Sequence, residues 1–284
     1  LGVSEAGEPQ NKQISAYAKN VLFITIEDLR DDVLGCYNSP VVKTPNIDKL
    51  AKKGVLFKRA YCQFPVCNPS RSSFLTGLRP DTTGILDNVK SLFHENPNIV
   101  TLPAVFKNSG YYTARLGKVF HGTGEHDDPN AWVETFDLDD DEIAKKGTGR
   151  NMTNGKVEWC RWLAAEGQDS NHSDGKNALK AIELLSRKSD SNFFIAIGFH
   201  KPHDPFIAPK KYFDMYPLDE VVPPTLPPGI AKEPEIVFGS RWKKAFDEFS
   251  EKDKKEFLRA YYACISFTDA QVGKVLDVMD RQNL

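Results

Sequence analysis

The sequence predicts an α/β fold with a doubly wound sheet between layers of helices. Two continuous apolar runs, Val21–Ile26 and Phe193–Phe199, have the composition of strands that are buried on both faces of a sheet. Elsewhere, cap residues and prolines mark where helices begin, and glycines mark where they end. Because strand and helix signals alternate along the chain, we expect the strands to form a sheet that helices cover.

Start and stop signals locate the elements of the first half of the chain. Pro45 stands at the first position of a helix that Gly54 ends. Val55–Tyr61 has the composition of a short strand. Thr101–Asn108 repeats the cap-and-helix pattern, and Tyr111–Leu116 is the next predicted strand.

Two longer helices are predicted in the second half. Apolar residues recur at helical spacing in Ser173–Lys188 and in a segment from Ser250 to about Asp280. We expect two segments to be irregular, because Gly122–Glu142 holds nine acidic residues and Tyr216–Pro234 holds six prolines. The positions expected to face the core are Ala178, Leu179, Ile182 and Leu185 in the first helix, and Phe257, Ala260, Cys264, Val272, Val275 and Met279 in the second.

Composition and charge exclude several classes of protein. The 284 residues are 40% apolar and 27% charged, which is ordinary for a globular protein and excludes a fibrous or wholly disordered chain. The 37 basic and 39 acidic residues give a formal net charge of −2, so no overall positive field attracts nucleic acid or an anionic membrane. The apolar runs are too short to span a bilayer. We therefore expect neither a nucleic-acid partner nor a membrane span.

The N-terminal residues 1–19 are polar and are interpreted as an extension that precedes a folded domain of residues 20–284. This extension contains no apolar signal-peptide core. Because the first residue is not methionine, we expect a signal peptide to have been removed.

The sharpest motif lies between Val66 and Gly77 and has the form C-x-P-S-R followed by x-x-x-L-T-G. Pro69 is expected in the first turn of a helix, with Cys67 just before it. A helix N-terminus favours developing negative charge, and Arg71 can fold back towards the same point. The pattern suits a nucleophile with a cation beside it, and from spacing alone a buried thiol beside a helix cap fits equally well.

This run resembles the signature of the type I, formylglycine-dependent sulfatases. The resemblance implies an alkaline-phosphatase-like mixed sheet flanked by helices, and a periplasmic or secreted location (lysosomal in a eukaryote). It also implies that a formylglycine-generating enzyme oxidises Cys67 to formylglycine. One hydroxyl of the hydrated aldehyde would then attack sulfur, the other would drive sulfate elimination, and Arg71 would hold the hydrate.

Glu27 and Asp28 follow the first predicted strand, at the sheet edge where α/β proteins bind ligands. Paired carboxylates suit a hard divalent cation, although a helix cap or a solvated pair is the commoner role of such residues. Similarity to sulfatases implies that Glu27 and Asp28 bind calcium, or less favourably magnesium, together with the formylglycine made from Cys67. Glu27 departs from the Asp-Asp pair that is usual in the family.

Two further segments follow predicted strands and resemble the iduronate-2-sulfatase branch. The first is Gly-Lys-Val-Phe-His, in which Lys118 and His121 correspond to the family's contacts to the sulfate ester. The second is His-Lys-Pro-His, in which His200 matches the histidine that binds or protonates the leaving oxygen. Lys201 and His203 are candidate substrate contacts, although solvation of a loop explains them equally well.

The resemblance predicts a sulfuric-ester hydrolase that acts on a sulfated sugar, such as a 2-O-sulfated uronate of a glycosaminoglycan or algal polysaccharide. Two alternatives are a formylglycine-dependent phosphonate or phosphodiester hydrolase and a non-catalytic sugar-binding relative. Sulfatases have a later strand that completes the calcium site, and a small C-terminal subdomain. We expect both to lie outside residues 1–284, on a second polypeptide or a longer chain, and expect these residues alone to be inactive.

Overall fold

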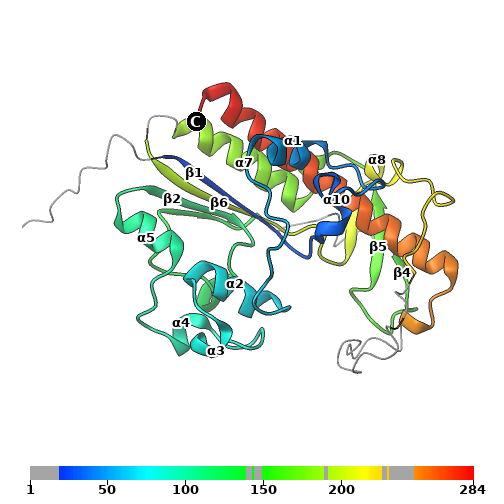
Figure 1. The fold of residues 1–284 in the computed structure, drawn as a ribbon, viewed down its shortest axis with the longest axis horizontal. Coiled ribbons are helices and arrows are strands. Elements are labelled where there is room, and N and C mark those ends of the chain that lie inside the picture. The colour runs from blue at the N-terminus through cyan, green and yellow to red at the C-terminus, as the bar shows by residue number, and fades with distance from the viewer. Residues whose placement is uncertain (1–18, 139–142, 144–148, 189–190, 226–228, 230–245) are drawn as a thin grey trace, which may run out of the picture.

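The computed structural model describes residues 19–138, 143, 149–188, 191–225, 229 and 246–284. The larger of its two sheets is parallel and has the strand order β1-β6-β2-β3 (Figure 1). In the smaller sheet, of order β4-β5-β7, the first pair is antiparallel and the second parallel. The strands are β1 (Val21–Ile26), β2 (Tyr112–Gly117), β3 (Glu134–Phe136), β4 (Arg150–Asn151), β5 (Arg161–Ala165), β6 (Phe193–Phe199) and β7 (Phe206–Pro209).

Helices cover both faces of the larger sheet, with α7 and α10 on one face and α2 and α5 on the other (Figure 1). The helices are α1 (Pro45–Lys53), α2 (Cys67–Thr76), α3 (Pro80–Thr83), α4 (Leu92–Glu95), α5 (Leu102–Asn108), α7 (Ser173–Arg187), α8 (Lys210–Phe213) and α10 (Glu251–Gln282). Short 3-10 turns lie at Asp31–Val33, Gly35–Tyr37, Gly124–His126 and Asp169–Asn171. No helix of the described residues has the length and hydropathy of a membrane span.

The central strand β6 contributes to the cores on both faces. Its side chains point alternately to the two faces, so Ile195 and Ile197 pack towards α7 and α10, while Phe194 and Ala196 pack towards α2 and α5. All seven residues of β6 are buried. The apolar run therefore forms the doubly buried strand that the sequence predicts.

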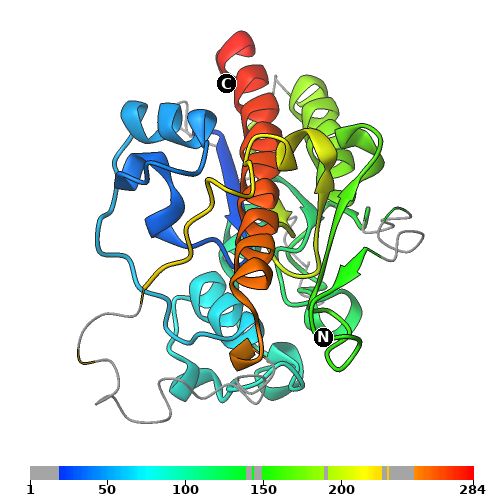
Figure 2. The ribbon, with the colours of Figure 1, turned by 90° about the vertical axis from the view of Figure 1, so that its right-hand side faces the viewer.

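The long helix α10 joins the two sheets. Its second half packs on the larger sheet through Val272 and Val275, and its first half packs on the smaller sheet through Ala260 and Cys264. Figures 1 and 2 show the helix running the length of the molecule. Ser250 caps it by accepting a hydrogen bond from the backbone N–H of Asp253, so the helix begins where the sequence predicts.

Several predicted elements differ in the structure. β1 forms as predicted but is only half-buried, because among the described residues it pairs with β6 alone. Val55–Tyr61 is not a strand: it pairs with no strand among the described residues, bends at residues 58–59 and lies on the surface, with Val55 81% exposed. On α7, Leu179 faces solvent while Ala181 and Leu184 are buried in its stead.

The two segments expected to be irregular are only partly described. The acidic segment contains a 3-10 turn and β3, which pairs with β2. Residues 139–142 of it lie outside the described chain, as do 226–228 and 230–234 of the proline-rich segment. The N-terminal extension lies outside it up to residue 18.

Asp169 is a buried ionic link between α8 and α10, and it makes stability depend on pH. Its carboxylate lies 2.7 Å from both Lys211 Nζ and Lys274 Nζ and accepts a hydrogen bond from the Tyr212 hydroxyl. Burial opposes ionisation, but the two lysines outweigh it and hold the pKa of Asp169 well below its usual range. The ion pairs of Asp169 therefore stabilise the fold above pH 3.8, the ordinary pKa of an aspartate. This stabilisation is lost as the pH falls through the lowered pKa of Asp169.

We expect Asp169→Asn to lower the free energy of unfolding at neutral pH by about 1–3 kcal/mol. The difference from the unaltered protein should narrow as the pH falls below 3.8. Urea unfolding at neutral and acid pH measures both quantities. A difference that stays constant with pH would show that the ionisation of Asp169 does not contribute.

Candidate functional site

The candidate site lies where three parallel strands end at the same edge of the larger sheet. Glu27 follows β1, Lys118 follows β2 and His200 follows β6. The ends are tied together, since the Glu27 backbone N–H donates to the Phe199 carbonyl at 3.2 Å. The β–α topology thus brings together three segments that are far apart in sequence.

The Glu27 side chain is at the centre of this site and is only 3% exposed. One of its oxygens lies 2.7 Å from Lys118 Nζ and 3.7 Å from His200 Nδ1, and the other lies 3.6 Å from the Arg71 guanidinium. Burial opposes ionisation, but Arg71 and Lys118 outweigh it and lower the pKa of Glu27 to about 2. Both oxygens are enclosed, with the Lys118 ammonium against one and the Arg71 guanidinium beside the other.

Cys67 is the first residue of α2, two residues before Pro69, so the helix begins earlier than the sequence predicts. The N-cap residue supplies no side-chain hydrogen bond to this helix. The adjacent Asn68 anchors it instead, because its side-chain amide donates to the carbonyls of Asp87 and Lys90. Cys67 Sγ is thereby held at the helix N-terminus, facing Glu27.

Arg71 is buried, and its contacts are to Glu27 and to the loop after β2. Its guanidinium donates to the carbonyls of Lys118 at 2.5 Å and Val119 at 2.8 Å. The predicted cation is thus present beside the site. It is held by the backbone of the Lys118 segment and carries the charge that compensates Glu27.

The loop after β6 is held in place by hydrogen bonds to a carboxylate that no sequence motif pointed to. Asp174, at the start of α7, accepts hydrogen bonds from the backbone N–H groups of His200 and Lys201, both at 2.8 Å. The Lys201 ammonium donates to the carbonyls of His203 and Pro205, at 3.1 and 2.8 Å. Acidic residues are common in the first turn of a helix, so nothing in the sequence indicated that Asp174 contacts a distant loop.

The contact of Asp174 predicts a measurable effect on stability. Asp174→Ala would remove the acceptor of the buried Lys201 N–H and of the part-buried His200 N–H, which should lower the free energy of unfolding by about 1–3 kcal/mol. Asp277→Ala, at a carboxylate that is 61% exposed on α10, is the matched control and should change it by about 0.5 kcal/mol or less. Equal effects in urea unfolding would contradict the bracing role.

The histidines of the site are in opposite electrostatic surroundings. Burial, with Lys201 and His203 adding to it, lowers the pKa of His200 to about 3, so its imidazole is neutral near pH 7. Burial also acts on His203, but hydrogen bonds with Asp204 and Cys67 outweigh it and raise its pKa to about 10. Burial and the neighbouring Lys118 lower the pKa of His121. A neutral His200 favours hydrogen bonding to a leaving oxygen over full proton transfer.

Two cavities are lined by residues of the site. One, of about 350 Å³, is lined by Lys118, His121, His200 and Lys201. The other, of about 560 Å³, is lined by Glu27, Asp28, Cys67 and Arg71. The structure thus separates the sequence-predicted substrate contacts from the nucleophile side, with His203 placed next to Cys67 and Glu27 rather than in the first cavity's lining.

The carboxylate oxygens of Glu27 and Asp28 are ligands of the type that a hard divalent cation prefers. Both oxygens of Glu27 are enclosed, and Asp28 lies beside it with its side chain 56% exposed. Asp28 adopts a left-handed backbone (φ 54°), and its carbonyl accepts a hydrogen bond from the Tyr261 hydroxyl at 2.6 Å. Calcium takes about six to eight oxygens, so within the described residues these two carboxylates supply part of a calcium shell.

The sequence profile of the Sulfatase family matches residues 19–284. The chain belongs to the Sulfatase family. Among curated sulfatases, it is 36% identical to iduronate 2-sulfatase of Mus musculus over 93% of this chain and 51% of that protein. It is 33% identical to a sulfatase of Formosa agariphila over 92% of this chain and 55% of that protein. The chain therefore spans about half the length of the curated sulfatases it matches, and the predicted relation to the iduronate-2-sulfatase branch is confirmed.

Solved structures share the fold of this chain. Phosphonate monoester hydrolase of Agrobacterium radiobacter superimposes with a TM-score of 0.75 at 20% identity, over 92% of this chain and 59% of that one. A 2-O GAG sulfatase superimposes with a TM-score of 0.62 at 21% identity, over 93% and 54%. At such identities the likeness concerns the fold alone. This likeness confirms the alkaline-phosphatase-like α/β fold that the resemblance to sulfatases predicts.

Proposed function

We propose that this chain carries the nucleophile side of a sulfuric-ester hydrolase that removes sulfate from a sulfated sugar. The observation that carries the proposal is the cluster of Cys67 with Arg71, Lys118 and His200 around one buried carboxylate, Glu27. Three cationic or hydrogen-bonding groups beside a nucleophile suit an anionic ester whose charge moves during reaction. Similarity to iduronate 2-sulfatase over most of the chain favours a 2-O-sulfated uronate.

In this proposal Cys67 is converted to formylglycine by a formylglycine-generating enzyme, and its hydrate is the nucleophile. One hydroxyl loses its proton as it forms the new S–O bond, the bond between sulfur and the sugar oxygen breaks, and that oxygen takes up a proton from water, so the sugar leaves as an alcohol. His200 donates a hydrogen bond to that oxygen from the sugar side of the site. The second hydroxyl then loses its proton, the aldehyde forms again, and sulfate leaves with the oxygen that attacked; water restores the hydrate.

Glu27 and Asp28 would hold calcium, which when bound would polarise the sulfate oxygens. The residues of the chain have separate roles. Lys118 and His121 line the cavity beside Glu27 and bind sulfate oxygens, and Arg71 holds the hydrate. Lys201 shapes the loop that presents His200. A periplasmic or secreted location would suit a sulfated polysaccharide as substrate.

Parallel assays of the full-length enzyme test the proposal. The substrates are an aryl sulfate, an aryl phosphodiester and a disaccharide with a 2-O-sulfated uronate, and sulfate or phosphate release is measured. Faster turnover of the sulfated disaccharide supports the proposal. A preference for the phosphodiester would overturn it in favour of phosphonate or phosphodiester hydrolysis, and the absence of both activities in enzyme with converted Cys67 would indicate a non-catalytic relative.

A further inference from the structure

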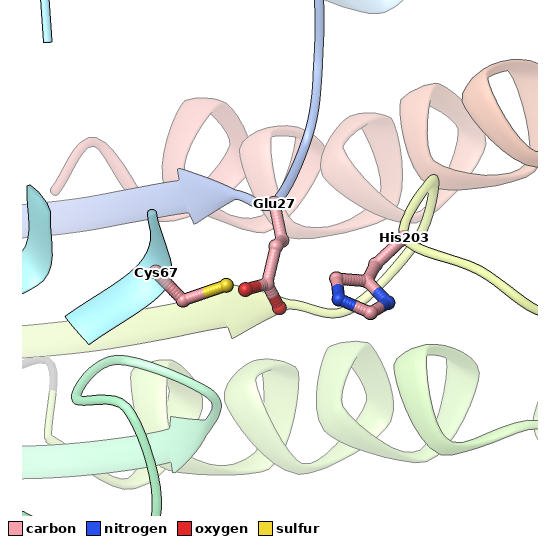
Figure 3. A group of neighbouring side chains, drawn as sticks. All are labelled: Glu27, Cys67 and His203. Carbon is pink, nitrogen blue, oxygen red and sulfur yellow. The ribbon is translucent and has the colours of Figure 1, made fainter. Parts of the chain in front are cut away.

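Three side chains that can each bind a metal ion converge at the candidate site. Figure 3 shows the Glu27 carboxylate between the Cys67 sulfur and the His203 ring. One donor atom from each lies within 4.8 Å of the other two. The three residues come from the end of β1, the start of α2 and the loop after β6, so the fold itself builds this group.

The donor set differs from that of a calcium site. Calcium binds oxygen almost exclusively, whereas thiolate sulfur, imidazole nitrogen and one carboxylate oxygen together suit a borderline-soft cation such as Zn²⁺. The sulfur is present only while Cys67 remains a thiol. The same position therefore offers different metal chemistry before and after the cysteine is converted.

The surroundings of His203 have the form of a supported metal ligand. Its Nδ1 lies 2.8 Å from the Asp204 carboxylate and 2.6 Å from the Asp204 carbonyl oxygen, which leaves Nε2 for the cluster. A carboxylate that holds the second ring nitrogen is the usual partner of a zinc-binding histidine. Asp28 lies 3.8 Å from Nε2 and offers a further oxygen.

The charges at the site admit a divalent cation. Lys118 and Arg71 now compensate Glu27, while the carboxylates of Asp28 and Asp204 flank His203. A cation would replace the Lys118 ammonium on Glu27, and Lys118 already lines the adjoining cavity, into which it can turn. Binding also displaces the protons of the thiol and the imidazole, so it is measured at mildly alkaline pH.

We propose that the thiol form of this protein binds Zn²⁺ through Glu27, Cys67 and His203, and that the bound ion masks the Cys67 sulfur. The site exists only in protein whose Cys67 has not been converted to formylglycine. The metal site itself is tested without turnover, so this proposal and the proposed function fail separately.

Cobalt(II) is the probe for the metal site, since a thiolate ligand gives it a charge-transfer band in the near ultraviolet. We expect this band when Co²⁺ is added to the full-length protein with Cys67 as a thiol, and we expect Zn²⁺ to displace it. Cys67→Ser and His203→Gln should each lose the band, whereas Cys62→Ser and His94→Gln, at exposed positions, should keep it. Asp204→Asn should weaken Co²⁺ binding about 10–100-fold.

Alkylation gives a second readout within one peptide. Trypsin releases Ala60–Arg71, which holds both Cys62 and Cys67. Zn²⁺ should slow iodoacetamide labelling of Cys67 and leave that of Cys62 unchanged. Absence of the cobalt band, its persistence in Cys67→Ser, or equal labelling with and without Zn²⁺ would overturn the proposal. Circular dichroism of His203→Gln separates loss of the site from loss of the fold.

Discussion

Replacing Cys67 by alanine is expected to abolish sulfate release by the full-length enzyme, with a fall in kcat/KM of about 10⁶-fold, as for loss of a covalent nucleophile. The helix N-terminus, Arg71 and Lys118 would remain in place, but no atom would be left to form the bond to sulfur. Stability should change by about 1 kcal/mol or less, because alanine is a good helix former and the side chain is only half-buried. Kinetics on a 2-O-sulfated disaccharide and urea unfolding measure the two effects.

Cys62→Ala is the matched control for this prediction. Cys62 is five residues away and exposed; it lines the cavity on the nucleophile side but is not one of the three side chains that cluster at Glu27. Its loss should leave turnover unchanged. Mass spectrometry of the Ala60–Arg71 peptide tests the cause, since conversion to the aldehyde should occur at Cys67 alone. Retained sulfate release by Cys67→Ala would contradict the assignment of the nucleophile.

The sequence was most informative where local chemistry and long-range packing agree. β6 and α10 could be predicted because a doubly buried strand needs a continuous apolar run and a helix packed on a core needs apolar residues at helical spacing. The smaller sheet could not be predicted in this way. Its strands β4 and β7 are too short to show a periodic pattern, and their pairing through β5 depends on contacts between distant segments.

At the candidate site too, some features could be predicted from the sequence and others could not. Motif spacing placed Cys67 and Lys118 at the ends of secondary-structure elements, and the structure brings both to Glu27. Sequence could not show that Glu27 is the buried centre while Asp28 turns outward, because the left-handed backbone of Asp28 depends on its tertiary contact with Tyr261. Asp174 was missed for a similar reason: its partners are backbone groups, which leave no pattern in the sequence.

Neutralising Glu27 is the second large effect we expect. Glu27→Gln keeps the size of the side chain but leaves Arg71, which is 6% exposed, and Lys118, which is 16% exposed, without their common counter-charge. Breaking a buried ion pair by removing one partner costs about 3–5 kcal/mol of folding free energy. Turnover should fall at least about 10²–10³-fold, because Lys118, which binds the sulfate, and Arg71, which holds the hydrate, lose the carboxylate that positions them.

Two further variants distinguish the charge of Glu27 from the length of its side chain and from the charge of its neighbour, Asp28. Glu27→Asp keeps the charge on a shorter side chain, which is the residue usual in sulfatases, so it should retain most of the stability and of the turnover. Asp28→Asn removes a neighbouring carboxylate that is 56% exposed, and it should leave stability within about 1 kcal/mol of the unaltered protein. Urea unfolding and kinetics of the three variants decide the matter. If Glu27→Gln were as stable and active as Glu27→Asp, the buried charge would not organise the site, and Lys118 and Arg71 would owe their positions to the backbone carbonyls and loops alone.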